Sequence, residues 1–265
     1  MKDFERKCLE VAKEAASEAG SFLKEHFYQR PEVEFKGEIN LITQRDRQSQ
    51  EIIYNVISKH LPNHAILGEE DLETEGSDNF LWVIDPIDGT TNYAHTLPIF
   101  CVSIALLVEH KPHIGVVYNP MLDEMFWSVK GEGAFLNQTR LRVSAEPDLG
   151  RSLVSTGFPY DLRESEDNNL DHFLKLIKLT QGIRRWGAAA IDISYVAAGR
   201  FDGFWEMKLY PWDTAAAVVF VEEAGGKVTD FNGGPFDPFK KEVLATNGKI
   251  HGKMVEILSV KIAKS

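Results

Sequence analysis

Two aspartates three residues apart, Asp85 and Asp88, follow a continuous apolar run and precede a glycine and two threonines. Carboxylates placed at the end of a buried strand can converge on one cation. Pro86 stiffens the turn between them, because its ring fixes φ and removes an N–H donor. Oxygen ligands without usable thiols favour Mg²⁺ or Mn²⁺ over zinc. The segment therefore predicts a divalent metal site.

The residues that follow could bind a phosphate. Gly89 lets an anion approach the backbone, and a helix beginning near Thr90 would point its free N–H groups at that anion. A bare DxxDG pattern is also typical of an acidic surface turn with a helix cap. An EF-hand loop fits poorly, since Pro86 and Ile87 interrupt the alternating ligands that such a loop needs.

Charge and composition limit the classes of function. Forty acidic residues against 29 basic ones give a net charge of -11, which argues against a protein that binds nucleic acid by neutralising phosphates. The only cysteines, Cys8 and Cys101, lie far apart and predict reduced, buried thiols. No run reaches the roughly 18 to 20 apolar residues of a membrane span, and no signal peptide is evident. We expect a cytoplasmic protein.

The elements that must position these residues are predicted from apolar periodicity and breakers. Helices are expected over residues 4–27, 43–60, 168–180, 188–198, 213–224 and from about 250. Strands are expected over 65–67, 80–84, 100–108, 114–118, 125–129, 133–136, 153–155 and 201–206, and near 228 and 243–245. The strand at 80–84 should end at Asp85, and the polar stretch 71–79 should be a loop. Residues 100–136 should form an antiparallel meander.

Several motifs together resemble one family. The string WVIDPIDGTTNYAH resembles the first signature of the inositol monophosphatase family, and PWDTAA resembles its second. The shorter motifs GEE, GEGAF, GAAA and EAGG, at residues 68–70, 131–135, 187–190 and 223–226, fall in the family's order. The resemblance covers nearly the whole chain and is closest to bacterial members, because of Arg184 and Arg185 before the Gly-Ala run.

The resemblance assigns roles to individual residues. Glu69, Asp85 and the carbonyl of Ile87 would hold a first metal, and Asp85, Asp88 and Asp213 a second. The catalytic residues it implies are Glu69, Thr90 and Asp88, with Glu69 and Thr90 positioning the attacking water. Its substrate-binding positions are Gly89, Thr90, Ala189, Glu206 and Asp213, and Lys36 and Asp46 match polar positions near a third, weaker metal. Alone, Asp213 could be a helix cap, and Glu70 could replace Glu69.

The resemblance also implies a fold and a reaction. We expect an α/β layered αβαβα sandwich, like that of inositol monophosphatase and fructose bisphosphatase, over residues 1–265. Its N-terminal half would span about 1–150 and its C-terminal half about 151–265. The expected enzyme is a Mg²⁺-dependent, lithium-inhibited, homodimeric phosphatase with two or three metals per site, and its substrate would be myo-inositol 1-phosphate. Rival substrates are fructose 1,6-bisphosphate, histidinol phosphate and 3'-phosphoadenosine 5'-phosphate. A partner-binding regulatory protein on the same scaffold is the rival from another class.

Overall fold

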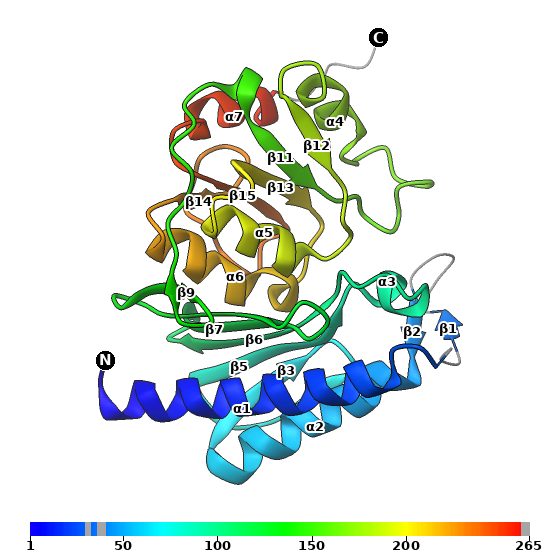
Figure 1. Ribbon diagram of the computed structural model, residues 1–265, viewed down its shortest axis with the longest axis vertical. Helices are drawn as coiled ribbons and strands as arrows, with labels where there is room; N and C mark the ends of the chain where they lie inside the picture. The colour runs from blue at the N-terminus through cyan, green and yellow to red at the C-terminus, as the bar shows by residue number, and fades with distance from the viewer. Residues whose placement is uncertain (30–32, 36–40, 261–265) are drawn as a thin grey trace.

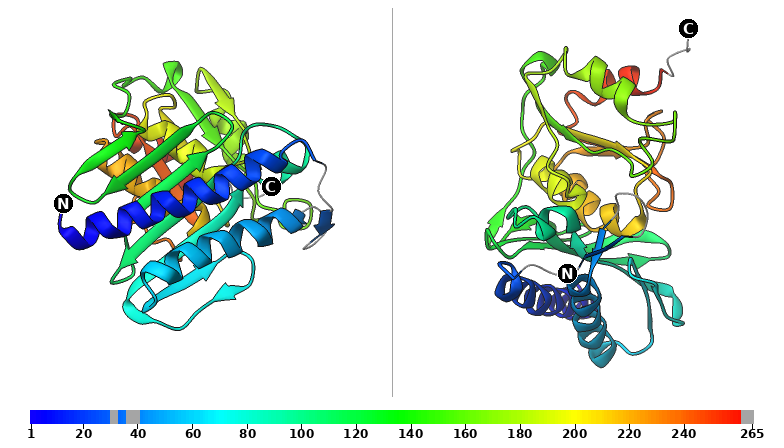
Figure 2. Two further views of the ribbon diagram at one scale, coloured as in Figure 1. Left: turned by 60° about the horizontal axis from the view of Figure 1, so that its bottom comes forward. Right: turned by 90° about the vertical axis from the view of Figure 1, so that its right-hand side faces the viewer.

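The computed structural model describes residues 1–29, 33–35 and 41–260, and the elements stack in five layers (Figure 1). Helices α1 (Asp3–His26) and α2 (Gln44–His60) form the first layer, and Figure 2 shows them side by side across one sheet. Cys8 and a stripe of small and aliphatic residues on α1 are buried. Thr43 caps α2, because its hydroxyl accepts a hydrogen bond from the N–H of Arg45.

The second layer is a sheet of eight strands, with β5 near its middle. Its order is β10 (Thr139–Arg140), β9 (Gly133–Leu136), β8 (Glu124–Val129), β7 (Lys111–Asn119), β6 (Cys101–Val108), β5 (Ser77–Asp88), β3 (His64–Gly68) and β4 (Leu72–Glu73). The strands are antiparallel except β3 and β5, which run parallel. Glu69 directly follows β3 and Asp85 lies near the carboxyl end of β5, so both lie at the same end of these parallel neighbours, where Gly68 pairs with Ile84.

The third layer is a pair of apolar helices, α5 (Ala189–Ala197) and α6 (Pro211–Glu223), packed between the two sheets (Figure 1). Helix α6 lies very close to β7 at Gly115: a Cβ there would stand 2.2 Å from the carbonyl oxygen of Ala216. A glycine at this point lets the helix backbone approach the sheet closely, so α6 packs directly on β7.

The outer layers complete the sandwich. A five-stranded sheet has the order β12 (Gly182–Arg184), β11 (Leu153–Thr156), β13 (Gly203–Met207), β15 (Glu242–Thr246) and β14 (Lys227–Thr229). Helices α4 (Leu170–Leu176) and α7 (His251–Leu258) cover its far face, and a 3₁₀ turn (Leu149–Arg151) precedes β11. The short helix α3 (Thr90–Ala94) lies near the ribbon of β1 (Val33–Phe35) and β2 (Leu41–Thr43).

The predicted layered α/β fold and the antiparallel meander are confirmed, and both cysteines are free and buried. Several predicted boundaries were wrong, and the short strands β1, β2, β10 and β12 were not predicted. Strand β5 continues past Asp85 to Asp88 through a shift of register, and β4 occupies part of the expected loop. Helix α4 is shorter than predicted, and α6 begins at Pro211, a favoured first position for proline. Within the described residues, no helix is long and apolar enough to cross a membrane.

Candidate active site

The end of β5 carries the two signature aspartates inside the protein. Asp85 and Asp88 are 2 % and 7 % exposed. The bulge between them lets the N–H of Ile87 donate to Asp85 Oδ1 at 2.9 Å, which orients that carboxylate. From α2, the hydroxyl of Ser49 donates to the carbonyl of Pro86 at 3.0 Å. The proline turn is therefore held from outside the sheet as well as by its own ring.

Gly89 and Thr90 turn the chain from β5 into α3. Gly89 has φ +96°, a conformation that favours glycine, and a Cβ there would make a tight contact of 3.1 Å with the carbonyl of Ile99. The Thr90 hydroxyl lies 3.0 Å from both the carbonyl of Ile87 and Asp46 Oδ1. A short helix, α3, does begin at Thr90, which is the condition named above for its N–H groups to face an anion.

Asp46 lies behind Thr90, close enough for its charge to contribute to the raised pKa of Asp85. It is fully buried in the first turn of α2, where its Oδ2 accepts from the N–H and hydroxyl of Thr43 at 2.8 and 2.6 Å. Burial raises the pKa of Asp46 to about 6. Lys36, which the sequence placed in the same neighbourhood, lies outside the described residues.

Segments far apart in the sequence meet at one small hollow of about 80 Å³. Its lining includes Glu69, Asp85, Ile87, Asp88, Gly89, Thr90, Glu206 and Asp213. Asp213 arrives from the first turn of α6, where its Oδ2 accepts from the N–H of Tyr210 at 2.7 Å. Asp213 thus caps its helix and also faces the hollow, so the two sequence-based alternatives for it are compatible.

The choice between Glu69 and Glu70 is supported by placement. Glu69 follows β3 and lines the hollow, whereas Glu70 does not. The backbone of Glu70 is fixed from α2 instead: its N–H donates to Gln50 Oε1 at 3.0 Å, and Gln50 Nε2 donates to its carbonyl at 2.8 Å. Gln50 therefore holds the turn that presents Glu69.

The carboxyl groups of the hollow raise one another's pKa values. Burial raises the pKa of Asp85 well above its ordinary value, and the charges of Glu69 and Asp88 add to the effect. Asp213 behaves in the same way, through burial and then the charges of Asp88 and Glu69. Ionisation of all these carboxyl groups together is therefore unfavourable unless a positive charge compensates for it.

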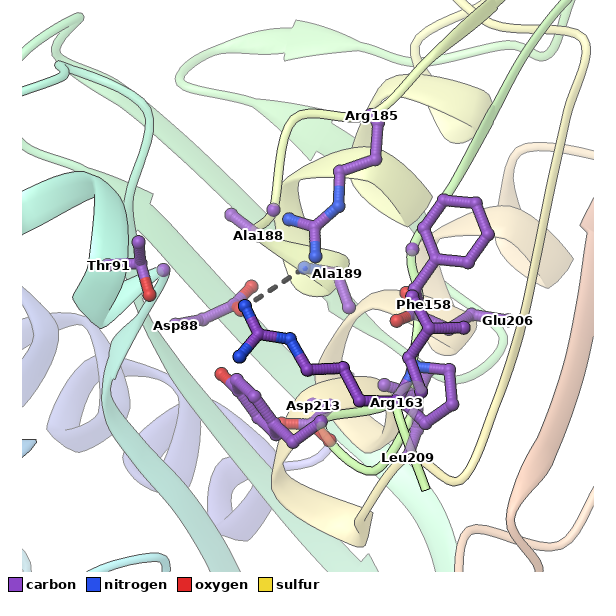
Figure 3. A pocket seen from close by; sticks show the side chains of 16 residues that line it. Asp88, Thr91, Phe158, Arg163, Arg185, Ala188, Ala189, Glu206, Leu209 and Asp213 are labelled. Atoms are coloured by element: carbon purple, nitrogen blue, oxygen red, sulfur yellow. Dashed lines mark hydrogen bonds between the residues drawn. The ribbon is translucent and has the colours of Figure 1, made fainter. Parts of the chain in front are cut away.

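All the polar side chains expected to face a cation offer oxygen, which suits Mg²⁺ or Mn²⁺. Among the described residues, however, no three His, Cys, Asp or Glu side chains stand in the arrangement of a formed metal site. Asp88 uses both oxygens elsewhere: they accept from the N–H groups of Ala189 at 3.1 Å and Ala190 at 2.7 Å. These bonds join β5 to the start of α5, and Figure 3 shows the one to Ala189.

The hollow adjoins a larger cavity of about 500 Å³. Asp88, Ala189, Glu206 and Asp213 face it in Figure 3, together with Arg163 and Arg185. Glu206 comes from β13 and is 8 % exposed. Burial raises the pKa of Glu206 to about 8, although Arg185 acts in the opposite direction.

Sequence reasoning missed part of this cavity wall. Phe158, Tyr160 and Leu162, with Arg163, come from the connection between β11 and α4, and Arg185 follows β12. The connection has no periodicity that sets it apart, and Arg185 was noted only as a bacterial feature. The one available signal was an arginine directly before the Gly-Ala motif, whose alanine was already placed in the substrate site.

The comparisons with known proteins agree with this architecture. The model of the inositol monophosphatase family matches residues 5–262, and the chain belongs to this family. It is 46% identical over 253 residues to an inositol-1-monophosphatase of Synechocystis, covering 95% of this chain and 88% of that protein. It is 41% identical over 246 residues to the Nus factor SuhB of Escherichia coli, covering 91% and 92% of the two chains.

A solved structure of inositol monophosphatase from Anabaena superposes with a TM-score of 0.88 at 43% identity, covering 96% of both chains. The recognition of the family, the fold class and the enzyme class, a phosphatase, are confirmed. The roles of the individual site residues stay predictions.

Proposed function

We propose that the chain is a Mg²⁺-dependent phosphomonoesterase that hydrolyses myo-inositol 1-phosphate to inositol and phosphate. The observation that carries the proposal is the meeting of Glu69, Asp85, Asp88 and Asp213 at one hollow that opens into a cavity containing Glu206. The Synechocystis relative, with 46% identity, carries the name of this activity.

The carboxylates would hold the cations. Glu69, Asp85 and the Ile87 carbonyl would bind one ion, and Asp85, Asp88 and Asp213 a second. Bound Mg²⁺ supplies charge neutralisation for the phosphate dianion and lowers the pKa of a coordinated water. The mutual repulsion of these carboxylates supports the proposal, because cations relieve it. Small side-chain rotations are required, and Mn²⁺ suits the same ligands.

The residues around Thr90 would position the water and the phosphate. The Thr90 hydroxyl can donate its single proton to the Ile87 carbonyl or to Asp46, so its oxygen keeps a fixed place and can accept a hydrogen bond from water. The backbone N–H groups of Gly89 and Thr90 would bind the phosphate at the start of α3. Phosphoryl transfer needs placement and charge stabilisation more than covalent chemistry by the protein.

Glu206 and Ala189 would contact the leaving alcohol. With a pKa of about 8, Glu206 is largely protonated at neutral pH, and a protonated carboxyl both donates and accepts hydrogen bonds. A sugar-like hydroxyl offers the complementary pair. Substrates with another alcohol, such as fructose 1,6-bisphosphate, histidinol phosphate or 3'-phosphoadenosine 5'-phosphate, are the alternatives within this class.

A partner-binding role is the second candidate, because a relative with 41% identity is named a Nus factor. The retention of Glu69, Asp85, Asp88, Thr90 and Asp213 argues against loss of catalysis. The homodimer, the inhibition by lithium and the cytoplasmic location stay predictions, as does the absence of direct nucleic-acid binding.

The test is release of phosphate from a panel of these four esters by the wild type, Glu206→Leu and, as control, Glu256→Leu on the exposed side of α7. We expect inositol phosphate to be the best substrate of the wild type and of the control. Glu206→Leu should reduce the preference for inositol phosphate over the other esters, because leucine can neither donate nor accept a hydrogen bond. An unchanged profile would remove Glu206 from the choice of substrate, and no hydrolysis of any ester would refute the activity.

A further inference from the structure

One wall of the cavity is formed by the connection between β11 and α4, residues 157–169, which is called here the cap loop. Phe158, Pro159, Tyr160, Leu162 and Arg163 from this loop line the cavity. In Figure 3, Phe158 and Arg163 face Arg185 and Asp88 across the open space. The cap loop therefore closes the cavity on the side opposite to α5.

Tyr160 is the cap-loop residue that brings a hydroxyl group to the hollow of the carboxylates. Phe158, Pro159 and Tyr160 all line both the cavity and this smaller hollow, and of the three only Tyr160 has a side chain that can donate a hydrogen bond. The residue is 56 % exposed overall, so part of its ring faces the solvent, while partial burial raises the pKa of its hydroxyl. The charges of Glu69 and Asp213, followed by those of Asp88 and Asp85, raise the pKa further. Tyr160 therefore lies over the hollow, within range of the charges of all four carboxylates. Because its pKa is raised, its hydroxyl stays protonated and able to donate a hydrogen bond.

The cap loop is fastened at both ends. At its start and end, the Asn169 side chain donates to the carbonyl of Gly157 at 2.7 Å and accepts from Trp205 Nε1 at 2.8 Å. In its middle, Lys208 Nζ donates to Asp161 Oδ2 at 2.6 Å and to the Ser165 hydroxyl at 2.9 Å.

Lys208 directly follows β13, the strand that carries Glu206, and has φ +61°. Its bond to Asp161 therefore ties Tyr160 to the segment that joins Glu206 to Asp213. The Asp161 and Lys208 side chains are 45% and 23% exposed, and a pair so close to water adds little to global stability. Its effect is on the place of the loop.

We propose that Tyr160 binds the substrate by donating its phenolic hydrogen to a non-bridging oxygen of the phosphate, and that the Asp161–Lys208 pair positions it. The inference rests on the proposed phosphatase function. A phosphoryl group on the carboxylate hollow would meet the N–H groups of Gly89 and Thr90 on one side. Tyr160 supplies a neutral donor from the other, solvent side, where the developing charge on the phosphoryl oxygens needs one.

The first experiment compares Tyr160→Phe with Tyr118→Phe. The control also loses a phenolic hydrogen bond, since the hydroxyl of Tyr118, a residue of β7, donates to Asp123 Oδ1 at 3.1 Å. Calorimetry with Mg²⁺ present measures the affinity for inorganic phosphate, and initial rates give kcat/KM for inositol phosphate. A hydrogen bond to a charged acceptor predicts about a tenfold loss of both in Tyr160→Phe. The control should match the wild type, and affinity for Mg²⁺ alone should be unchanged.

Three contradicting outcomes are distinguishable. A wild type that hydrolyses the ester while Tyr160→Phe binds phosphate and turns over equally well would overturn the role of Tyr160 alone. A wild type that hydrolyses none of the esters would overturn the proposed function, and this inference with it. Loss of Mg²⁺ affinity in Tyr160→Phe would show that the phenol serves the metal ligands and not the phosphate.

The second experiment exchanges the charges of the pair. Asp161→Lys and Lys208→Asp should each weaken phosphate binding and raise KM severalfold, without lowering the melting temperature appreciably. The double variant should recover most of the loss, because the pair can form in reverse. Single variants equal to the wild type, or a double variant no better than the worse single one, would overturn the positioning role. The second result would instead indicate that Lys208 acts through its own charge.

Discussion

Replacing Asp88 by asparagine separates what this residue does for the fold from what it does for the cation. Asp88 accepts two backbone hydrogen bonds that fasten α5 to β5, and it lies among like charges. Asparagine has the same shape but no charge. One of its two terminal atoms can still accept from Ala189 or Ala190, while the other becomes an N–H donor that faces a second donor.

Two opposed terms decide the stability of Asp88→Asn in a chelator. Burial raises the pKa of Asp88 from 3.8 to about 6, and the bonds to Ala190 and Ala189 offset this only in part. A shift of roughly 2 units makes the ionised form cost about 3 kcal/mol above pH 6, and asparagine removes that cost. A lost hydrogen bond with a buried N–H left unpaired costs about 1 to 3 kcal/mol. The terms nearly cancel, so we expect the variant to lie within about 2 kcal/mol of the wild type.

The assay is urea unfolding at pH 8 with and without Mg²⁺. Because the pKa is raised, the wild type in chelator loses stability as the pH rises from about 4 through 6, and the variant lacks this component. Mg²⁺ at about 100 times its dissociation constant adds roughly 2.7 kcal/mol to a protein that binds it only when folded. The wild type should show this gain and Asp88→Asn much less of it. An equal gain in both, or a variant far less stable in chelator, would refute the reasoning.

Three other predictions follow from close contacts and burial. Gly157→Ala should lower the rate of turnover but leave the melting temperature nearly unchanged. Its Cβ would meet the flexible carboxyl end of Glu206 at 2.1 Å, and that end can move. A large fall in the melting temperature would contradict this. Gly115→Ala should cost about 1 to 3 kcal/mol in urea unfolding, because its Cβ would meet the rigid carbonyl of Ala216, and an unchanged midpoint would contradict the close approach. Burial lowers the pKa of His251 to about 4, so the stability it contributes is present above pH 6.5 and is lost as the pH falls through 4. Unfolding of His251→Gln should depend less on pH in that range, by up to about 3 kcal/mol, and an identical pH dependence would count against it.

The layered fold was predictable because its parts have strong local signals. The period of α1, the continuous apolar run of β5 and the turn residues of the meander each specify one conformation. The end of β5 was not predictable in the same way. Pro86 usually ends a ladder, but here a bulge carries the chain past it, and pairing of Asp88 with Cys101 on β6 becomes visible only when both strands are in place.

In the candidate site too, residues in recognisable motifs were predictable and residues placed by long-range contacts were not. Asp85, Asp88 and Asp213 were recognisable because they stand in motifs, and the structure brings them to one hollow with Glu69. Tyr160 and Arg163 were not, because the cap loop has no periodic pattern and its place depends on contacts with Lys208 and Asn169, far away in sequence or at the far end of the loop. The assignment of Asp46 to the neighbourhood of a third metal stays a prediction, and its observed bonds are to Thr43 and Thr90.

The most direct measurement is the rate of phosphate release from myo-inositol 1-phosphate as Mg²⁺ is removed by a chelator and then restored. The gathering of four carboxylates at one hollow predicts that the rate falls to the background and returns in full, and that Asp213→Asn shows no such return. Hydrolysis that continues at the full rate in excess chelator would contradict the account.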